Sequence, residues 1–375
     1  MVLAHGKITD EGIAELRARL GTYNRPSFYG VGQFNEYAGR DAIRHYAQGI
    51  GDLNPLWLDE EYARKTKYGC IVAPPCFLYS VYWSSGRVGG LPGVHGFHSG
   101  SDWGFRKTIY VNDRITVKEK FIDLVEKESK FARRTVILYC RTHYRNQRGE
   151  VIAATKGWSV KAERGAAKES GKYSSIEAAK YTPEEIEAIE AAVLAEEVRG
   201  PNPRFWEGVN VGDELKPVVK GPLSHGDLIA FAAGALGGLA HGAALREYRR
   251  HPAWMYRDPK TGATEAIARV HDQTEAAQGI AIPGAYDFGC QRLSWLGHLM
   301  TNWIGDDGFL KVLYGELRRF NVVGDTQWCK GKVTKKYLEG GEHLVDLDIW
   351  AENQRHEITA PGHATAVLPS KSDAI

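Results

Sequence analysis

The chain of 375 residues contains two stretches that resemble each other, and this internal repeat limits the fold more than any other feature. The segment AIRHYAQGIGD, residues 42–52, corresponds to DLIAFAAGALGG, residues 227–238, because each is an apolar helical stripe that runs into a glycine-rich turn. Further on, Asp113 in VNDRITVKEKF corresponds to Asp325 in VVGDTQWCKGKV. Both copies end in segments that alternate apolar and polar residues, as strands do. The chain is therefore expected to hold two copies of one unit.

Each copy is expected to consist of a helix, a loop, a second apolar helix and several antiparallel strands. The second helices are predicted in PPCFLYSVYW, residues 74–83, and in AYDFGCQRLSWLGHLMTNWI, residues 285–304. A long buried helix beside consecutive antiparallel strands predicts an α+β fold in which the sheet wraps around the helix. Two such units can pair edge to edge, which gives one continuous sheet and removes an exposed edge from each unit.

A segment rich in Ala, Glu and Lys, residues 161–203, separates the two copies and ends in RGPNP. Within it, Thr182 as N-cap, Pro183 at the first helical position, Glu185 completing a capping box and Gly200 as a stop predict one connecting helix. The expected organisation is a first unit at residues 1–160, a linker at residues 161–203 and a second unit at residues 204–375, the last with an insertion at residues 239–269.

Composition excludes several classes of function. The 48 basic and 46 acidic residues are mixed along the chain, which disfavours a nucleic-acid partner. Five scattered cysteines predict reduced thiols in a cytoplasmic protein. No apolar run approaches the roughly 20 residues that span a bilayer, so no membrane segment is expected. Metal-binding spacings such as HExxH and nucleotide motifs such as GxGxxG are absent from the sequence, and neither a metal nor a bound cofactor is expected.

Several motifs resemble those of one known family. The stretch GDLNPLWLDEEYA, residues 51–63, is similar to the signature GDxNPLHxDxxxA of MaoC-like hydratases and dehydratases, the type 2 enoyl-CoA hydratase family. GCIVAPPCF, NDRITV and NQRGEVIA also resemble the first half of that family, and IPGAYDFG, FNVVGDT and GKVT resemble its second half. The resemblance implies a tandem, or double, hotdog fold, with two antiparallel sheets each wrapped around a long central helix. It also implies reversible addition of water across the 2,3 double bond of an acyl thioester.

The family's aspartate and histidine, five residues apart, are divided between the two copies. Trp57 occupies the histidine position of the first copy, whereas Asp52 is kept. Counting back six residues from the alanine that ends the motif places His271 in the histidine position of the second copy, where Ala266 replaces the aspartate. Each copy therefore retains one member of the pair.

The second copy is expected to carry the chemistry. The resemblance implies that His271 acts as general base and acid on the water, since a histidine near its own pKa suits both directions of the reaction. It also implies that a backbone amide at the start of the long helix, assigned to Gly284, stabilises the charge that develops on the thioester oxygen. The missing acid is assigned to Asp287, with Glu265 and Asp258 as alternatives.

Other residues are expected to shape the substrate pocket. Trp57 is a candidate to fill the vacated first site or to line an acyl channel, and Asp52 to hold its turn or to contact substrate. His241 and Tyr286 are candidate substrate contacts in the second half. The insertion at residues 239–269 enters the chain beside the expected site and is expected to be a lid or a pocket wall.

The sequence therefore predicts an acyl-thioester hydratase or 3-hydroxyacyl dehydratase. The substrate partner would be an acyl-CoA or an acyl-carrier thioester, with Arg318 and Arg319 as candidates to contact the phosphates of CoA, and the protein is expected to form a homodimer or a higher homo-oligomer. Two alternatives stay open: a hotdog acyl-CoA thioesterase, and a catalytically silent acyl-CoA-binding or assembly subunit.

Overall fold

The computed structural model describes residues 6–374, except residues 25–32, 87, 130–132, 164–176, 178, 238–240, 253–254, 259 and 281. The helical segments of the first half are α1 (Asp10–Ala18), α2 (Arg40–Gly49), α3 (Pro55–Leu58), α4 (Glu60–Arg64), η1 (Pro75–Phe77) and α5 (Leu78–Val81). Those that follow are α7 (Pro183–Leu194), η2 (Trp206–Gly208), α8 (His225–Phe231), η3 (Ala232–Leu236), α9 (His241–Arg250), η5 (Ile267–His271), α10 (Thr274–Gln278), α11 (Gly289–Ile304) and η6 (Lys371–Ala374). Within this part of the chain, none of these helices has the length and apolar character needed to cross a bilayer.

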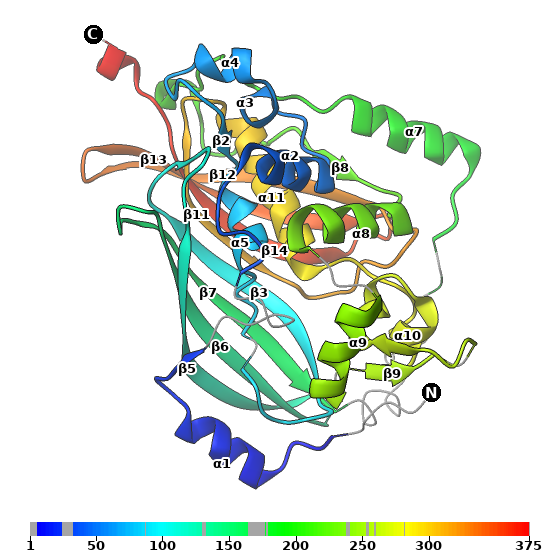
Figure 1. Ribbon diagram of the computed structural model, residues 1–375. Coiled ribbons are helices and arrows are strands. Elements are labelled where there is room, and N and C mark those ends of the chain that lie inside the picture. The colour runs from blue at the N-terminus through cyan, green and yellow to red at the C-terminus, as the bar shows by residue number, and fades with distance from the viewer. Residues whose placement is uncertain are drawn as a thin grey trace.

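Strands from both halves form one ten-stranded sheet in the order β1-β5-β6-β7-β3-β11-β14-β13-β12-β8 (Figure 1). Its strands are β1 (Tyr23–Asn24), β3 (His95–Phe105), β5 (Thr116–Ser129), β6 (Arg133–Arg145), β7 (Val151–Ala162), β8 (Val218–Lys220), β11 (Phe309–Glu316), β12 (Gln327–Glu339), β13 (Glu342–Asn353) and β14 (Ile358–Val367). Two short pairs lie outside it, β2 (Val72–Ala73) with β4 (Ile109–Tyr110) and β9 (Met255–Arg257) with β10 (Thr264–Ala266). The order β5-β6-β7-β3 in one half is mirrored by β12-β13-β14-β11 in the other.

The two halves meet where β3 pairs with β11 in antiparallel register. Trp103 lies opposite Leu313, and Ser101 lies opposite Gly315. These are the inner edge strands of the two units, so their pairing satisfies backbone groups that each unit would otherwise expose. The predicted continuous sheet and the α+β double hotdog architecture are confirmed.

Helix α11 lies against this sheet and is the centre of the core (Figure 1). Its residues from Cys290 to Ile304 are all buried, and these include the polar side chains of Gln291, His298 and Asn302. Gly297 allows the close approach of the first half, since a Cβ atom there would lie 2.5 Å from the Cys76 sulfur. One apolar cluster extends from Ala38 to Leu368, so the two halves share a single core.

The central helix of the first half ends two residues before the predicted segment does. It comprises η1 and α5 and ends at Val81, and Tyr82 is already extended. The buried carboxylate of Glu119 accepts hydrogen bonds from the hydroxyls of Tyr82 at 2.9 Å and Ser84 at 3.0 Å. The Tyr144 hydroxyl donates to the Tyr82 carbonyl at 2.6 Å, which takes an acceptor that a continuing helix would use. These bonds explain why the helix stops.

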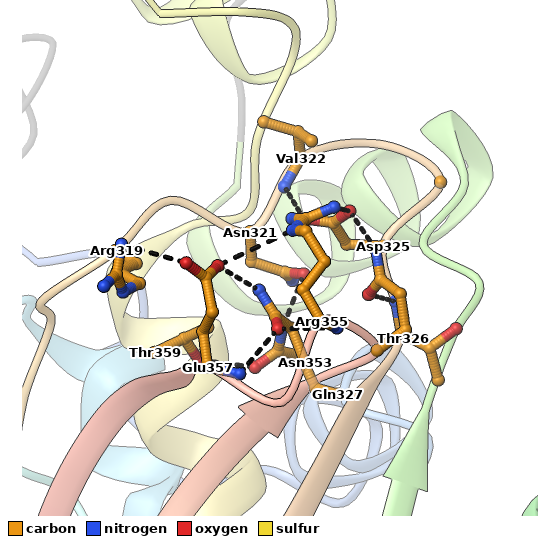
Figure 2. Close-up of polar contacts among 12 residues, drawn as sticks. Arg319, Asn321, Val322, Asp325, Thr326, Gln327, Asn353, Arg355, Glu357 and Thr359 are labelled. Carbon is orange, nitrogen blue, oxygen red and sulfur yellow. Dashed lines mark hydrogen bonds and ion pairs between the residues drawn. The ribbon is translucent and has the colours of Figure 1, made fainter. Parts of the chain in front are cut away.

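The repeat is also visible in matching side-chain bonds at one turn of each half. In the first half, Gln147 Nε2 donates to Asp113 Oδ1 at 2.9 Å. In the second half, Gln354 Nε2 donates to Asp325 Oδ1 at 2.6 Å. Figure 2 shows Arg355 beside the same carboxylate, to which it donates two bonds of 2.9 and 2.6 Å. The predicted correspondence of Asp113 and Asp325 is confirmed. Asp113 precedes β5 and bonds to the turn between β6 and β7, and Asp325 precedes β12 and bonds to the turn between β13 and β14.

The connecting helix begins as predicted and ends earlier. The Thr182 hydroxyl accepts from Glu185 N at 3.2 Å and the Glu185 carboxylate accepts from Thr182 N at 2.8 Å, which completes the capping box. Helix α7 then ends at Leu194 rather than near Gly200.

Replacing Asp325 with alanine should lower the free energy of unfolding by about 3 kcal/mol, because the buried carboxylate is the acceptor for Gln354 and for the Arg355 guanidinium. Urea unfolding of the full chain measures the change. Asp348, which is exposed on β13, provides the matched Asp348→Ala control. A loss for Asp325→Ala no larger than that of the control would contradict the structural role of this turn.

Candidate functional site

The segment before α11 is extended, which moves the start of the helix along the chain. Tyr286 forms a β-bridge with Val322, and Asp287 N donates to Asn321 O at 3.0 Å. Because these backbone groups bond to a neighbouring strand-like segment, the helix begins at Gly289. The prediction that Gly284 opens the helix is wrong in position, since Gly284 lies five residues earlier in the chain.

His271 ends η5 and lies against this extended segment. Its Nδ1 atom is 2.9 Å from the Tyr286 carbonyl oxygen, and its ring stacks on Phe288 with centroids 4.0 Å apart. A carbonyl oxygen only accepts, so in the neutral ring Nδ1 carries the proton and Nε2 carries the basic lone pair. The imidazole therefore lies beside the residue that precedes the first turn of α11.

A cavity of about 2000 Å³ runs between the two halves at this point. The second half contributes His271 and Gly289 to its wall, and the first half contributes Trp83 and His98. Trp83 Nε1 donates to His98 Nδ1 at 3.2 Å, and a Cβ atom on residue 289 would lie only 2.7 Å from that same nitrogen. Only glycine fits at the helix start, and its N–H belongs to the first turn, whose amides have no acceptor within the helix.

The inserted segment forms another wall of this cavity. It folds into α9 and the β9–β10 hairpin, which lie beside α10 (Figure 1). Ala244 and Tyr248 of α9 pack on Ala266, and the chain then passes directly into η5 and His271. His241 begins α9, and its side chain lies outside the described residues, as do residues 239–240, 253–254 and 259 of the insertion.

Asp287 also lines the cavity, but its carboxylate is held by other side chains. Arg292 donates to both carboxylate oxygens, at 2.7 Å from Nε to Oδ2, and Asn321 Nδ2 donates to Oδ2 at 3.1 Å. The Arg292 guanidinium donates in addition to the carbonyl of Arg319 at 2.6 Å. This buried ion pair connects the extended segment that contains Asp287 to the neighbouring segment that contains Arg319 and Asn321.

Two other acids share the cavity with His271. Arg269 Nε lies 3.0 Å from Asp272 Oδ1, and Arg269 Nη1 lies 3.9 Å from Glu265 Oε2. Burial raises the pKa of Asp272, against the opposing effect of Arg269. Asp258, in contrast, accepts from the backbone amides of Lys260 and Thr261 at 2.8 Å each and so closes its own turn. Asp272 was not singled out from the sequence, although it directly follows His271.

The corresponding position in the first half contains no imidazole, and the first residue of the helix there has no amide hydrogen. Trp57 is buried and lines a separate small cavity with Leu78 and Ile304. The helical segment there begins at Pro75, whose nitrogen carries no hydrogen.

Asp52 belongs to a buried polar cluster that joins four segments of the chain. Its Oδ1 accepts from Asn54 N at 3.0 Å and lies 3.4 Å from His298 Nε2 on α11. The same nitrogen lies 2.8 Å from Glu196 Oε1, which follows α7, and Lys220 Nζ donates to Gly51 O at 2.8 Å. The cluster ties the first-half motif and the linker to the central helix of the second half.

Stability should depend on pH through Glu196. Burial raises the pKa of its carboxyl, but His298, Lys220 and Asn302 outweigh burial and lower the pKa to about 2. Because this value lies below the ordinary glutamate pKa of about 4.3, the stabilisation is present above pH 4.3 and is lost as pH falls toward 2.

Wild-type protein should accordingly lose about 2–3 kcal/mol of unfolding free energy over that range through this group, and Glu196→Gln should flatten the profile. Urea unfolding at several pH values between 2 and 7 provides the measurement. The neighbouring Glu197, whose side chain is 71% exposed, supplies the control Glu197→Gln. Parallel profiles for wild type and Glu196→Gln would rule out this contribution.

Sequence comparisons relate the first half of the chain to known proteins. A family model described as FAS1-like, dehydratase domain region, matches residues 28–155. A probable enoyl-CoA hydratase alpha subunit from Thermomonospora curvata is 30% identical over 137 residues. That match covers 32% of this chain and 42% of the relative, so the chain spans less than half of the relative's length.

Solved structures share the fold over nearly the whole chain. A MaoC-like dehydratase superposes with a TM-score of 0.65 and 17% identity, covering 95% of this chain and 100% of that one. A Mycobacterium tuberculosis protein described as having a double hotdog fold gives a TM-score of 0.54 at 11% identity, covering 88% of this chain and 92% of that one. Together these structures show that the chain has the double hotdog fold, and the sequence matches relate its first half to the FAS1-like dehydratase region and to the enoyl-CoA hydratase subunit.

Proposed function

We propose that this protein adds water to, or removes it from, carbons 2 and 3 of an acyl thioester, with His271 as the general base and acid. The carrying observation is the position of the His271 ring, which stacks on Phe288 and bonds through Nδ1 to the Tyr286 carbonyl at the start of α11. A basic nitrogen and a helix N-terminus beside one cavity are the two groups that this reaction requires.

In the hydration direction, His271 Nε2 removes a proton from water while the water oxygen bonds to carbon 3. The electrons of the double bond move toward the thioester, and negative charge develops on its oxygen. The protonated imidazole then supplies a proton to carbon 2, so one water is added and the histidine returns to its neutral form. Dehydration follows the same steps in reverse.

The amide of Gly289 is the better supported oxyanion donor. It stands at the first position of α11, where the helix dipole favours negative charge, and the approach of His98 leaves no room for a side chain there. Gly284 lies five residues before the helix, where no helix dipole reinforces its amide. The absence of a donor proton at Pro75 in the first half supports the assignment of catalysis to the second half.

Asp272 is the carboxyl that we propose in place of the missing motif aspartate. It lines the same cavity and directly follows His271 in the chain, and burial raises its pKa, which suits a group that shares a proton. Asp287 would act as a positioning residue, since both of its oxygens accept from Arg292. Tyr286 would orient His271 through its carbonyl oxygen, and Trp57 would fill the unused first site.

A His271→Ala variant should reduce kcat for hydration of crotonyl-CoA or a longer enoyl-CoA by about 10²- to 10⁴-fold, because the variant lacks the proposed general base. The loss of enoyl absorbance measures turnover. His225→Ala, at an exposed position that does not line the cavity, should retain wild-type rates.

Two results would contradict the proposal. Release of free thiol without hydration would identify a thioesterase. Turnover that is absent from wild type with every acyl-CoA, or equal in wild type and His271→Ala, would favour a silent binding subunit or a different base.

A further inference from the structure

The cavity is strongly cationic although the chain as a whole is nearly neutral. Nine Lys and Arg residues but only three Asp and Glu residues line it, against 48 and 46 in the whole chain. The three acids, Glu265, Asp272 and Asp287, lie against Arg269 and Arg292. The remaining basic side chains are therefore not balanced by acids of the cavity wall.

Most of this charge lies on two segments that flank the His271 site. Arg249 and Arg250 end α9 and Arg257 lies on β9, while Arg318 and Arg319 follow β11. All five residues are exposed. The two segments thus form cationic walls on an open part of the cavity.

Some of these arginines have acidic partners outside the cavity. Arg250 pairs with Glu247 at 2.6 Å, and Arg319 pairs with Glu357 at 3.1 Å. Arg318 also contacts a glutamate. For Arg249 and Arg257, no carboxylate among the described residues is within ion-pair distance, and Arg257 donates only to the Gly262 carbonyl at 3.0 Å. These two guanidinium groups of the insertion carry uncompensated charge.

We infer that the insertion wall, through Arg249 and Arg257, binds the nucleotide phosphates of CoA, so that the substrate is a CoA thioester rather than a carrier-bound one. The inference rests on the proposed function. The planar guanidinium group binds phosphate through paired hydrogen bonds and also stacks on an aromatic base, which suits an adenine nucleotide.

The size of the cavity favours the nucleotide as well. Ordinary ligand pockets measure about 300–1,000 Å³, whereas this cavity measures about 2000 Å³. A carrier-bound substrate inserts only its pantetheine arm and acyl group and leaves the carrier outside. Arg249 and Arg257 line the cavity itself and lie on a segment that the first copy lacks. Their position suits a CoA thioester, whose charged nucleotide enters the cavity together with the pantetheine arm.

The insertion wall lies close in the chain to His271, which connects the proposed binding of the nucleotide to the proposed reaction site. Helix α9 packs on Ala266 through Ala244 and Tyr248, and the five residues after Ala266 lead to His271. On the other side, the Arg319 carbonyl accepts from Arg292 of α11, three residues after Gly289. A nucleotide bound between these walls would hold the pantetheine arm close to the start of α11.

The test uses the full chain and the double variant Arg249→Ala/Arg257→Ala. Calorimetric titration with CoA and with adenosine 3′,5′-bisphosphate should show Kd raised at least tenfold, because each lost charged hydrogen bond is equivalent to about a tenfold change in affinity. KM for crotonyl-CoA should rise by a similar factor with kcat unchanged, and KM for crotonyl-pantetheine should stay constant. Arg246→Ala, exposed on α9 and not in the cavity wall, is the matched control with one charge removed.

The outcomes separate this inference from the proposed function. Arginine-dependent CoA binding by a protein that hydrates no thioester would support the inference and contradict the hydratase proposal, and His271→Ala should bind CoA like wild type. Unchanged CoA affinity in the double variant would overturn the inference. It would also be overturned by a higher kcat/KM for a crotonyl-carrier protein than for crotonyl-CoA.

Discussion

The antiparallel pairing of β3 with β11 is the constraint on which the rest of the structure depends. It joins two half-sheets into one surface, and this surface buries α11 against strands of both halves. A helix that is buried on every side cannot be covered by one half alone, so the long helix and the joined sheet require each other. The cavity lies at the same seam, which explains why its wall includes His98 from the first half and His271 from the second.

The two copies differ at the start of the central helix and at the position that Trp57 occupies in one and His271 in the other. In the first, Trp57 fills the histidine position, and bonds to the buried Glu119 stop the helix soon after Pro75. In the second, α11 runs for 16 residues from Gly289. The fold does not depend on these differences, because neither an imidazole nor an amide hydrogen at these positions is needed to pair strands or to fill the shared core.

Buried polar contacts position the segment beside His271. The pair between Asp287 and Arg292 fixes the extended segment whose Tyr286 carbonyl orients His271. On the same helix, His298 meets Asp52 and Glu196. Asp52 of the first copy is therefore connected to α11, and its partner there is His298 of the second half.

Local patterns of the sequence determined the repeat, the capped linker helix and the equivalence of Asp113 with Asp325, because caps, turns and strand periods depend on residues close together in the chain. The same patterns also predict that His271 occupies the position of Trp57 in the second copy. Only the tertiary structure decided where α11 begins, because the pairing of Tyr286 with Val322 joins distant segments and keeps Gly284 outside the helix. Only the tertiary structure also shows that Arg292 donates to the Asp287 carboxylate and that burial raises the pKa of Asp272. The chemistry of a carboxylate depends on its spatial neighbours, which sequence order does not reveal.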